Sequence, residues 1–371
     1  MKFETRKLGE LVINFDRKRV PLSSRQRSER QGVYPYYGAT SIMDYVDDYI
    51  FDGKYLLMGE DGTVIDENGK PILQIAEGKF WCNNHAHILQ NTELVTFDYL
   101  YYLLKNTNVQ SLVTGAVQPK ISQSNMNKLV LRIHKNKKEQ EKIARYLRLI
   151  DDKIELNNAI NNNLEQQAQA IYQQMFVDNP SSEWKQGTLS DIADITMGQS
   201  PSGSSYNEES IGAIFFQGRA EFGFRFPTVR LFTTEPKRMA CANDTLMSVR
   251  APVGDLNVAH TDCCIGRGLA AIHSKTNHQS FVLYTMFSLK KQLDVFNGEG
   301  TVFGSINRNS LNEMPILIPS DEKLDEFEGI VAPMDTAIRN NYDEICRLEQ
   351  IRDSLLPKLM SGEIDVSDID L

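Results

Sequence analysis

Two long stretches of the sequence repeat apolar residues in alternating steps of four and three, the pattern of a helix with one continuous apolar seam. The first stretch runs from Ile143 to Met175 and the second from Phe327 to Leu359. Because the two seams match, we expect the helices to bury them against each other, and the long segment between them permits an antiparallel pair. The alternative is that each is an ordinary amphipathic helix packed on its own domain.

Eight seam positions are expected to carry the helix pairing. They are Ile150, Ile154, Asn157, Leu164, Met334, Ile338, Asn341 and Leu348. Asn157 and Asn341 occupy equivalent places in the two seams, where a polar residue fixes register at some cost in stability. Pro333 departs from the pattern, since proline cannot donate a helical hydrogen bond. We therefore expect the second helix to start afresh or kink there, with residues 321–332 as a separate turn.

A second pattern, the apolar–polar alternation of a half-buried strand, occurs at Leu129, Leu131 and Ile133. It returns at a constant offset of 185 residues, at Met314, Ile316 and Ile318. Further identical pairs at this offset are Gly115/Gly300, Val117/Val302, Ile121/Ile306 and Asn127/Asn312. After a single-residue indel the match continues along the two helices, where Asp151 is aligned with Asp335. The chain is therefore an internal duplication.

The duplication predicts an α+β molecule with pseudo-twofold symmetry about a pair of long antiparallel coiled-coil helices. We expect a first globular domain over residues 1–135 and a central spacer helix over 136–180. A second globular domain follows over 181–320, and a C-terminal spacer helix with an acidic tail occupies 321–371.

Charge and cysteine content narrow the class of protein. The net charge is −9, and residues 321–371 carry 5 lysines and arginines against 14 acidic residues, which is nearly all of the excess. The two globular segments are thus near neutral, which permits a basic face. The 5 cysteines show no C-x-x-C spacing, so a disulfide framework is not expected. With no apolar run long enough for a membrane span and a charged start, we expect a cytoplasmic protein.

Catalytic signatures are missing, so the sequence predicts a binding protein and not an enzyme. There is no phosphate-binding G-x-x-x-x-G-K-[S/T] loop, no amino-methyltransferase signature and no H-E-x-x-H. His85 and His87 would share one face of a strand, yet the sequence offers no third metal ligand nearby. Asp66, Glu77 and Lys79 imitate a nuclease carboxylate–lysine set. We keep that nuclease reading as an alternative; no metal and no cofactor are expected in this chain.

Several longer motifs resemble the specificity subunits of Type I restriction–modification systems. The segments YPYYGATSIMDYVDDYIFDGKYLLMGEDG (34–62) and GKFWCNNHAHIL (78–89) are similar to a recurrent type of target-recognition domain. GAVQPKIS (115–122) and EQEKIARYLRLIDDKIELNN (139–158) resemble the end of that domain and the central helix. SLLPKLMSGEI (354–364) is similar to the family's C-terminal ending. The second globular region is the least family-like stretch.

The resemblance implies a division of labour. Each target-recognition domain would read one half of a bipartite site in double-stranded DNA, and the helices would set the separation of the halves. Type I methylation subunits, with S-adenosylmethionine, and Type I restriction subunits, with ATP, would join the assembly. No membrane partner is implied. The rival class is a coiled-coil adaptor that does not touch DNA.

Candidate DNA-binding residues combine cations with amides and aromatic rings, the groups that contact phosphates and base edges. In the first domain they are Lys18, Arg19, Tyr37, Asn84, His85 and Lys120. In the second domain they are Gln217, Arg219, Arg250, Arg267 and Arg308. Gln217, Arg219 and Arg267 stand beside glycines, which permit a close approach of the backbone. The alternative is that the charged residues lie on ordinary solvated loops and that the aromatic residues pack in the core.

Overall fold

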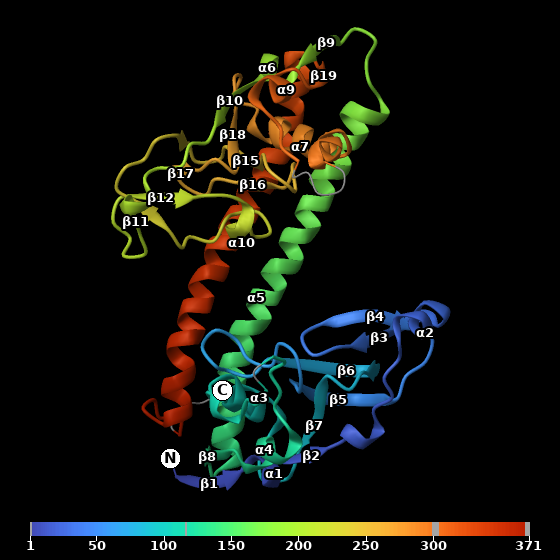
Figure 1. The fold of residues 1–371 in the computed structure, drawn as a ribbon, viewed down its shortest axis with the longest axis vertical. Helices are drawn as coiled ribbons and strands as arrows, with labels where there is room; N and C mark the ends of the chain where they lie inside the picture. The colour runs from blue at the N-terminus through green and yellow to red at the C-terminus, as the bar shows by residue number, and fades with distance from the viewer. Residues whose placement is uncertain (1, 116, 299–303, 368–371) are drawn as a thin grey trace. The chain divides into compact units, whose positions relative to one another are not determined.

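The computed structural model describes residues 2–115, 117–298 and 304–367. The chain divides into two compact units (Figure 1). Unit 1 comprises Met1–Glu155 with Ile345–Leu371, and unit 2 comprises Leu156–Glu344. Two long helices, α5 (Lys137–Tyr172) and α10 (Asp321–Ser361), each contribute residues to both units.

The described residues of unit 1 form a six-stranded sheet in the order β2-β7-β5-β6-β3-β4, and a two-stranded sheet of β1 and β8. The strands are β1 (Phe3–Lys7), β2 (Val12–Asn14), β3 (Gln31–Tyr37), β4 (Ile42–Val46), β5 (Phe51–Gly59), β6 (Leu73–Cys82), β7 (Ala86–Asn91) and β8 (Val130–His134). The shorter helices are α1 (Leu8–Leu11), η1 (Asp16–Lys18), α2 (Ser24–Glu29), α3 (Phe97–Lys105), η2 (Gln110–Leu112) and α4 (Gln123–Lys128).

Strand β5, in the middle of the larger sheet of unit 1, has apolar cores on both of its faces. Successive side chains of a strand point to opposite faces, so neighbours on β5 enter different cores. Leu56 packs in the core that holds Tyr99 of α3, whereas Leu57 packs with Phe80 in a second apolar cluster.

The described residues of unit 2 form a four-stranded sheet, β10-β18-β15-β16, a five-stranded sheet, β11-β13-β12-β17-β14, and the pair β19-β9. The strands are β9 (Lys185–Thr188), β10 (Ala193–Met197), β11 (Tyr206–Asn207), β12 (Ala213–Phe216), β13 (Phe232–Thr233), β14 (Met239–Ala240), β15 (Thr245–Ser248), β16 (Leu256–Val258), β17 (Cys263–Ile265), β18 (Leu269–Ser274) and β19 (Pro315–Ile318). The shorter helical segments are η3 (Gln173–Asp178), α6 (Leu189–Ile192), η4 (Gly203–Ser205), η5 (Arg219–Glu221), α7 (Gln279–Ser288), α8 (Lys290–Asp294), η6 (Val295–Asn297) and α9 (Arg308–Asn312).

The two units repeat one topology. In each, an early short strand pairs with a late one, β1 with β8 and β9 with β19. Each also contains one parallel strand pair, β3 with β6 and β12 with β17. The duplication predicted from the sequence is therefore present in the strand order. Its expected partners Gly300 and Val302, and residues 368–371 of the acidic tail, lie outside the described residues.

In unit 1 the first part of α5 pairs with the last part of α10. Ile143 and Leu147 are fully buried in the same core as Leu359. Further along, Nη1 of Arg352 lies 3.0 Å from Oδ1 of Asp151. Residue numbers increase along α5 in the direction in which they decrease along α10, so the two segments are antiparallel. Of the expected pairing positions in this unit, Ile154 is buried, and Ile150 and Leu348 are half-buried.

In unit 2 the same pairing continues with polar seam contacts. Nδ2 of Asn341 donates to Oδ1 of Asn161 at 2.8 Å, and Nδ2 of Asn157 donates to Oε2 of Glu344 at 2.7 Å. Asn157 is buried and Asn341 is half-buried in the seam. The two equivalent asparagines do not bond to each other in these contacts, since each has a different partner. The remaining expected positions lie in or against the core, with Ile338 buried and Leu164 and Met334 packed against it.

The expectation of a separate turn over residues 321–332 is wrong, because α10 runs unbroken from Asp321 to Ser361. Proline removes one helical hydrogen bond and its ring crowds the carbonyl four residues earlier. Here that residue is Gly329, beside which an added Cβ would meet nothing within 4 Å. Pro333 itself is exposed, whereas Phe327 and Val331 are fully buried. Burial of the apolar seam therefore outweighs the lost bond.

The fold is α+β, and the two long helices fit a coiled-coil linker. Within the described ranges, no helix combines the length and the apolar character that a membrane crossing requires.

Candidate nucleic-acid interface

In unit 2, two loops leave the same edge of the parallel pair β12–β17. Phe216 pairs with Ile265 at the ends of the strands. The loops are joined by the amide of Gly266, which donates to the carbonyl of Phe216 at 2.8 Å, and that of Gly268, which donates to the carbonyl of Gln217 at 3.2 Å. Parallel strands end at one edge, so the two loops that hold Gln217 and Arg267 lie side by side.

The backbone on both sides of Arg267 is tightly held. A Cβ added at Gly266 would lie 2.9 Å from Cα of Gln217, and one at Gly268 would lie 2.7 Å from its carbonyl oxygen. Only glycine allows this approach without a shift of the backbone. The amide of Arg267 also donates to Oγ of Ser200 at 3.2 Å. The exposed Arg267 side chain therefore projects from a fixed loop.

Arg250 lies beside Arg267. It follows Val249, the residue directly after β15, whose amide donates to the carbonyl of Gly268 at 2.9 Å. The two arginines line one open hollow of about 340 Å³, together with Met197, Gly304 and Ser305. Two of the expected DNA-binding cations are thus brought together on the surface of unit 2.

The other expected cations of unit 2 differ in their partners. Nη1 of Arg219 lies 2.6 Å from Oδ2 of Asp255, so this guanidinium is already paired. Arg308 is the exposed first residue of α9, directly after Asn307, whose side chain caps that helix. Among the described residues, Arg250, Arg267 and Arg308 make no ion pair with an acidic side chain.

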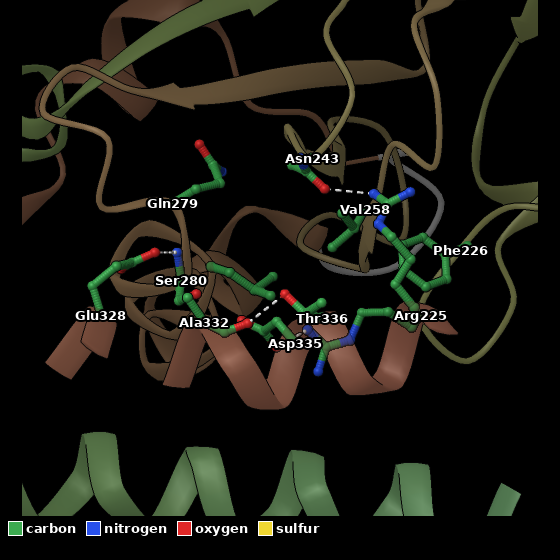
Figure 2. A pocket seen from close by; sticks show the side chains of 12 residues that line it. Arg225, Phe226, Asn243, Val258, Gln279, Ser280, Glu328, Ala332, Asp335 and Thr336 are labelled. Atoms are coloured by element: carbon green, nitrogen blue, oxygen red, sulfur yellow. Dashed lines mark hydrogen bonds and ion pairs between the residues drawn. The ribbon is translucent and has the colours of Figure 1, made fainter. Parts of the chain in front are cut away.

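Arg225, another arginine of the same region, is instead an internal anchor. Its side chain is buried and contacts Asp335 at 2.9 Å and Glu165 at 3.1 Å. Figure 2 shows Arg225 reaching Asp335 on α10, and Glu328 of the same helix reaching the amide of Ser280. These residues line a hollow of about 200 Å³ in which polar groups mainly bond to one another. These polar contacts connect Arg225, and Ser280 of α7, to α10.

Unit 1 holds its loops by the same set of backbone hydrogen bonds as unit 2, here called the loop frame, but with different side chains. The amide of Asn83 donates to the carbonyl of Tyr37 at 3.0 Å, as Gly266 does to Phe216. The amide of Glu60 donates to the carbonyl of His85 at 2.8 Å, as Val249 does to Gly268.

The last part of each frame also corresponds. The amide of Ile121 donates to the carbonyl of Glu60 at 2.8 Å, and that of Ile306 to Val249 at 3.1 Å. An isolated antiparallel bridge joins Asp61 to Lys120 in unit 1 and Arg250 to Ser305 in unit 2. By this register Asp61 corresponds to Arg250, and Asn84 to Arg267.

Arg19 and Lys120, two of the expected DNA-binding cations, both contact Glu60. Nη1 of Arg19 lies 2.5 Å from Oε2 of Glu60, and Nζ of Lys120 lies 3.2 Å from Oε1. Arg19 also donates to the carbonyl of Ala86 at 2.7 Å, and only 13% of its side chain is exposed. Arg19 is therefore committed to an internal network, whereas Lys120 remains exposed.

The network continues to Asp16 and His87. Nδ1 of His87 lies 2.6 Å from Oδ2 of Asp16, and its Nε2 bonds to the carbonyl of Ile121 at 2.8 Å. Burial opposes ionisation of Asp16, but hydrogen bonds and the charge of His87 prevail and hold the pKa of the Asp16 carboxyl below its ordinary value.

Asp16, Glu60 and His87 place donor atoms within 4.8 Å of one another, close enough to hold a cation. Arg19 and Lys120 already neutralise the Glu60 carboxylate. The donor set is thus used by the chain's own cations, and His85 faces Asp61 in a separate short contact.

The remaining expected residues of unit 1 are spread around this network. Lys18 is exposed, with its ammonium 5.3 Å from the Phe15 ring, and Asn84 is exposed in the loop after β6. Tyr37 is half-buried at the end of β3 against Phe80, and burial raises the pKa of its hydroxyl.

The nuclease alternative finds no assembled site in the described part of the chain. Asp66 accepts hydrogen bonds from the amides of Asn68 and Lys70 in its own turn. Lys79 lies over the ring of Tyr49, 4.5 Å from its centre. These two side chains are directed to separate neighbours, and Glu77 lines a different hollow beside α5.

A duplicated contact between a tyrosine and an aspartate was not found from the sequence. The hydroxyl of Tyr102 donates to Oδ2 of Asp151 at 2.8 Å, and that of Tyr284 to Oδ1 of Asp335 at 2.9 Å. Burial, with the neighbouring carboxylate, raises the pKa of each hydroxyl. The repeat aligns Asp151 with Asp335, and this alignment is the sequence feature that could have pointed to an equivalent contact in both units.

The frame defines a class of protein: a duplicated α+β molecule whose two lobes present loop residues from one common scaffold. A family model described as the Type I restriction modification DNA specificity domain matches residues 1–166 and 181–341. The chain therefore belongs to the specificity subunits of Type I restriction–modification systems, a non-catalytic family with a role in DNA recognition.

Individual relatives agree with this family. The chain is 30% identical over 290 residues to the putative Type I restriction enzyme MjaX specificity subunit of Methanocaldococcus jannaschii, covering 72% of this chain and 68% of that one. It is 23% identical over 346 residues to the MjaIX specificity subunit of the same organism, covering 83% and 79%. The fold is similar to the crystal structure of the Type I system S subunit from M. genitalium, with a TM-score of 0.66, 18% identity, and 99% and 97% of the two chains covered.

Proposed function

We propose that this chain reads a bipartite site in double-stranded DNA, with one half-site for each unit. The observation that carries the proposal is that the two units hold their loops by matching hydrogen bonds, while the exposed side chains on those loops differ. A common scaffold with different contact residues would select two different sequences. Lys18, Asn84, His85 and Lys120 in unit 1, and Gln217, Arg219, Arg250, Arg267 and Arg308 in unit 2, are the proposed contacts.

The paired helices then act as the spacer between the half-sites. Methylation subunits that carry S-adenosylmethionine, and restriction subunits that carry ATP, would assemble on this chain and act where it binds. The chain itself would supply position and not chemistry, because the sequence lacks the signatures of methyl transfer and phosphate cleavage.

The test is a map of methylated bases across the genome of the source cell, with and without this gene. We expect a two-part methylated motif that disappears when the gene is deleted and returns when it is restored. A coiled-coil adaptor without DNA contact predicts an unchanged methylation map, and that outcome would contradict the proposal.

A further inference from the structure

We propose that Arg250 and Arg267 are specificity-determining residues of unit 2 and that each selects a guanine in its half-site. This inference rests on the proposed function. Its starting point is that both arginines line the same surface hollow. Their partners by the backbone register of unit 1 are Asp61 and Asn84, which have different hydrogen-bonding chemistry.

The places of Arg250 and Arg267 in the loop frame support this inference. Two positions hold the same place in a duplicated backbone frame, yet carry a carboxylate and an amide in one unit and two guanidinium groups in the other. One buried pair of the frame, Ile121 and Ile306, is isoleucine in both units. A scaffold that reads two sequences must differ where it touches the bases, and these two positions, both exposed in unit 2, do differ from half-buried Asp61 and exposed Asn84 of unit 1.

Arg250 and Arg267 also differ from the neighbouring arginines in their contacts. Arg219, on the neighbouring loop, is held at 2.6 Å by Asp255, and Arg225 is buried between two carboxylates. Among the residues that the structure describes, Arg250 and Arg267 have no such acidic partner. Their guanidinium groups can therefore be directed at a ligand without breaking an ion pair.

Rigidity separates a base contact from a phosphate contact. A phosphate needs only a cation, whereas guanine O6 and N7 need two donors in a fixed orientation, which the planar guanidinium provides. The amide of Arg267 is bonded to Ser200, and both flanking glycines are closed in by Gln217. Arg250 lies between Val249 and Ala251, whose amides donate to Gly268 and Gly304 at 2.9 Å each. Both side chains thus start from fixed backbone.

The experiment is selection from a pool of random duplex DNA by the full-length chain, with the variants Arg250→Lys and Arg267→Lys. Lysine keeps the charge but loses the guanidinium fork. We expect the wild-type chain to select guanine at two positions of one half-site. Each variant should lose one guanine preference by about 10- to 100-fold, with nonspecific affinity changed less than about twofold.

Two controls belong to the same selection. Arg230→Lys, at an exposed arginine of the same unit whose Nη2 lies 2.9 Å from Oε1 of Glu221, should leave both half-sites unchanged. The half-site read by unit 1 serves as an internal control for folding, because each variant must still select it.

The outcomes separate the inference from the proposed function. If the wild-type chain selects two half-sites but the lysine variants retain every guanine preference, the two arginines do not read bases and the inference is overturned. The same holds if two further variants, Arg250→Ala and Arg267→Ala, weaken binding to all sequences evenly and lower its salt dependence by about one charge, the behaviour of a phosphate contact. If the wild-type chain selects no sequence, the proposed function itself fails.

Discussion

Arg19 illustrates how a side chain with the right chemistry for DNA can be engaged inside the protein. Its guanidinium contacts Glu60, Asp16 and the carbonyl of Ala86. In the matching frame of unit 2, Glu60 is replaced by Val249, which leaves no carboxylate there to hold a cation. The same loop position is therefore a closed ionic network in one unit and part of an open, arginine-lined hollow in the other.

Replacement of Arg19 by alanine should lower the free energy of unfolding by about 2 to 4 kcal/mol, because it leaves Glu60 and Asp16 largely buried with fewer partners. The measurement is urea denaturation followed by circular dichroism. Lys18→Ala is the matched control, since Lys18 is adjacent and exposed, and should change stability by less than about 0.5 kcal/mol. Equal effects of the two variants would contradict the internal role of Arg19.

The Asp16 carboxyl should make stability depend on pH. Because its folded pKa is held below the ordinary value of 3.8, the stabilisation is present above about pH 4 and is lost as the pH falls through the folded value. The free energy of unfolding, measured between about pH 6 and about pH 3, should fall more for the wild-type chain than for Asp16→Asn. Parallel curves for the two proteins would show that Asp16 does not contribute this dependence.

At the scale of elements, the duplicated tyrosine–aspartate contact joins a helix of each lobe to a long helix. Tyr102 lies on α3 and Asp151 on α5, while Tyr284 lies on α7 and Asp335 on α10. Neither contact is an apolar interaction, so neither follows from seam periodicity. Each fixes its lobe to a particular turn of the adjacent long helix, which register in the coiled coil alone would not do.

Tyr102→Phe and Tyr284→Phe should each cost about 1 to 3 kcal/mol of stability, because the buried Asp151 and the half-buried Asp335 each lose a hydrogen-bond donor while the ring remains. Tyr101→Phe is the control on the same helix as Tyr102: its ring is half-buried and packs edge-on against that of Tyr102. The measurement is again chemical denaturation. A loss of stability in Tyr101→Phe as large as in Tyr102→Phe would mean that the hydroxyl–aspartate bond is not the cause.

The elements differ in how far the sequence predicts them. The two seams and the duplicated strand order follow from periodicity, which reports burial on one face of a helix or strand. Pro333 misled the prediction because a local rule on proline does not include the burial of Phe327 and Val331 in the turns just before it. The contacts of Arg19 with Glu60 and of Tyr102 with Asp151 could not be predicted, since each joins residues more than 40 positions apart.

At the scale of the whole molecule, duplication implies modularity. Replacing residues 1–135 with another target-recognition domain should change one half of the methylated motif and leave the other half intact. The measurement is methylation mapping in cells that carry the chimera. A change in both halves, or in neither, would show that the lobes do not read DNA independently.

The paired helices should set the gap between the half-sites. Insertion of four residues after Asn158 adds about 6 Å to α5 and shifts the seam contacts of Asn157 and Asn161 relative to α10. We expect a methylated motif with a longer central gap, or loss of binding through disrupted pairing. Binding to synthetic sites with varied gaps is the check, and full affinity at the original gap would show that the helices do not determine the spacing.

The division of the chain into units also has a consequence for synthesis on the ribosome. Unit 2 is one continuous segment, Leu156–Glu344, whereas unit 1 needs Ile345–Leu371 in addition to the residues before it. Leu359 packs in the core of unit 1, and the carbonyl of Val366 accepts a bond from Lys142. The lobe whose translation begins first therefore cannot complete its core until the residues from Ile345 onward have been made, and the other lobe can finish folding before it. Until then the nascent first lobe exposes an apolar surface that Leu356, Leu359, Met360 and Val366 later cover.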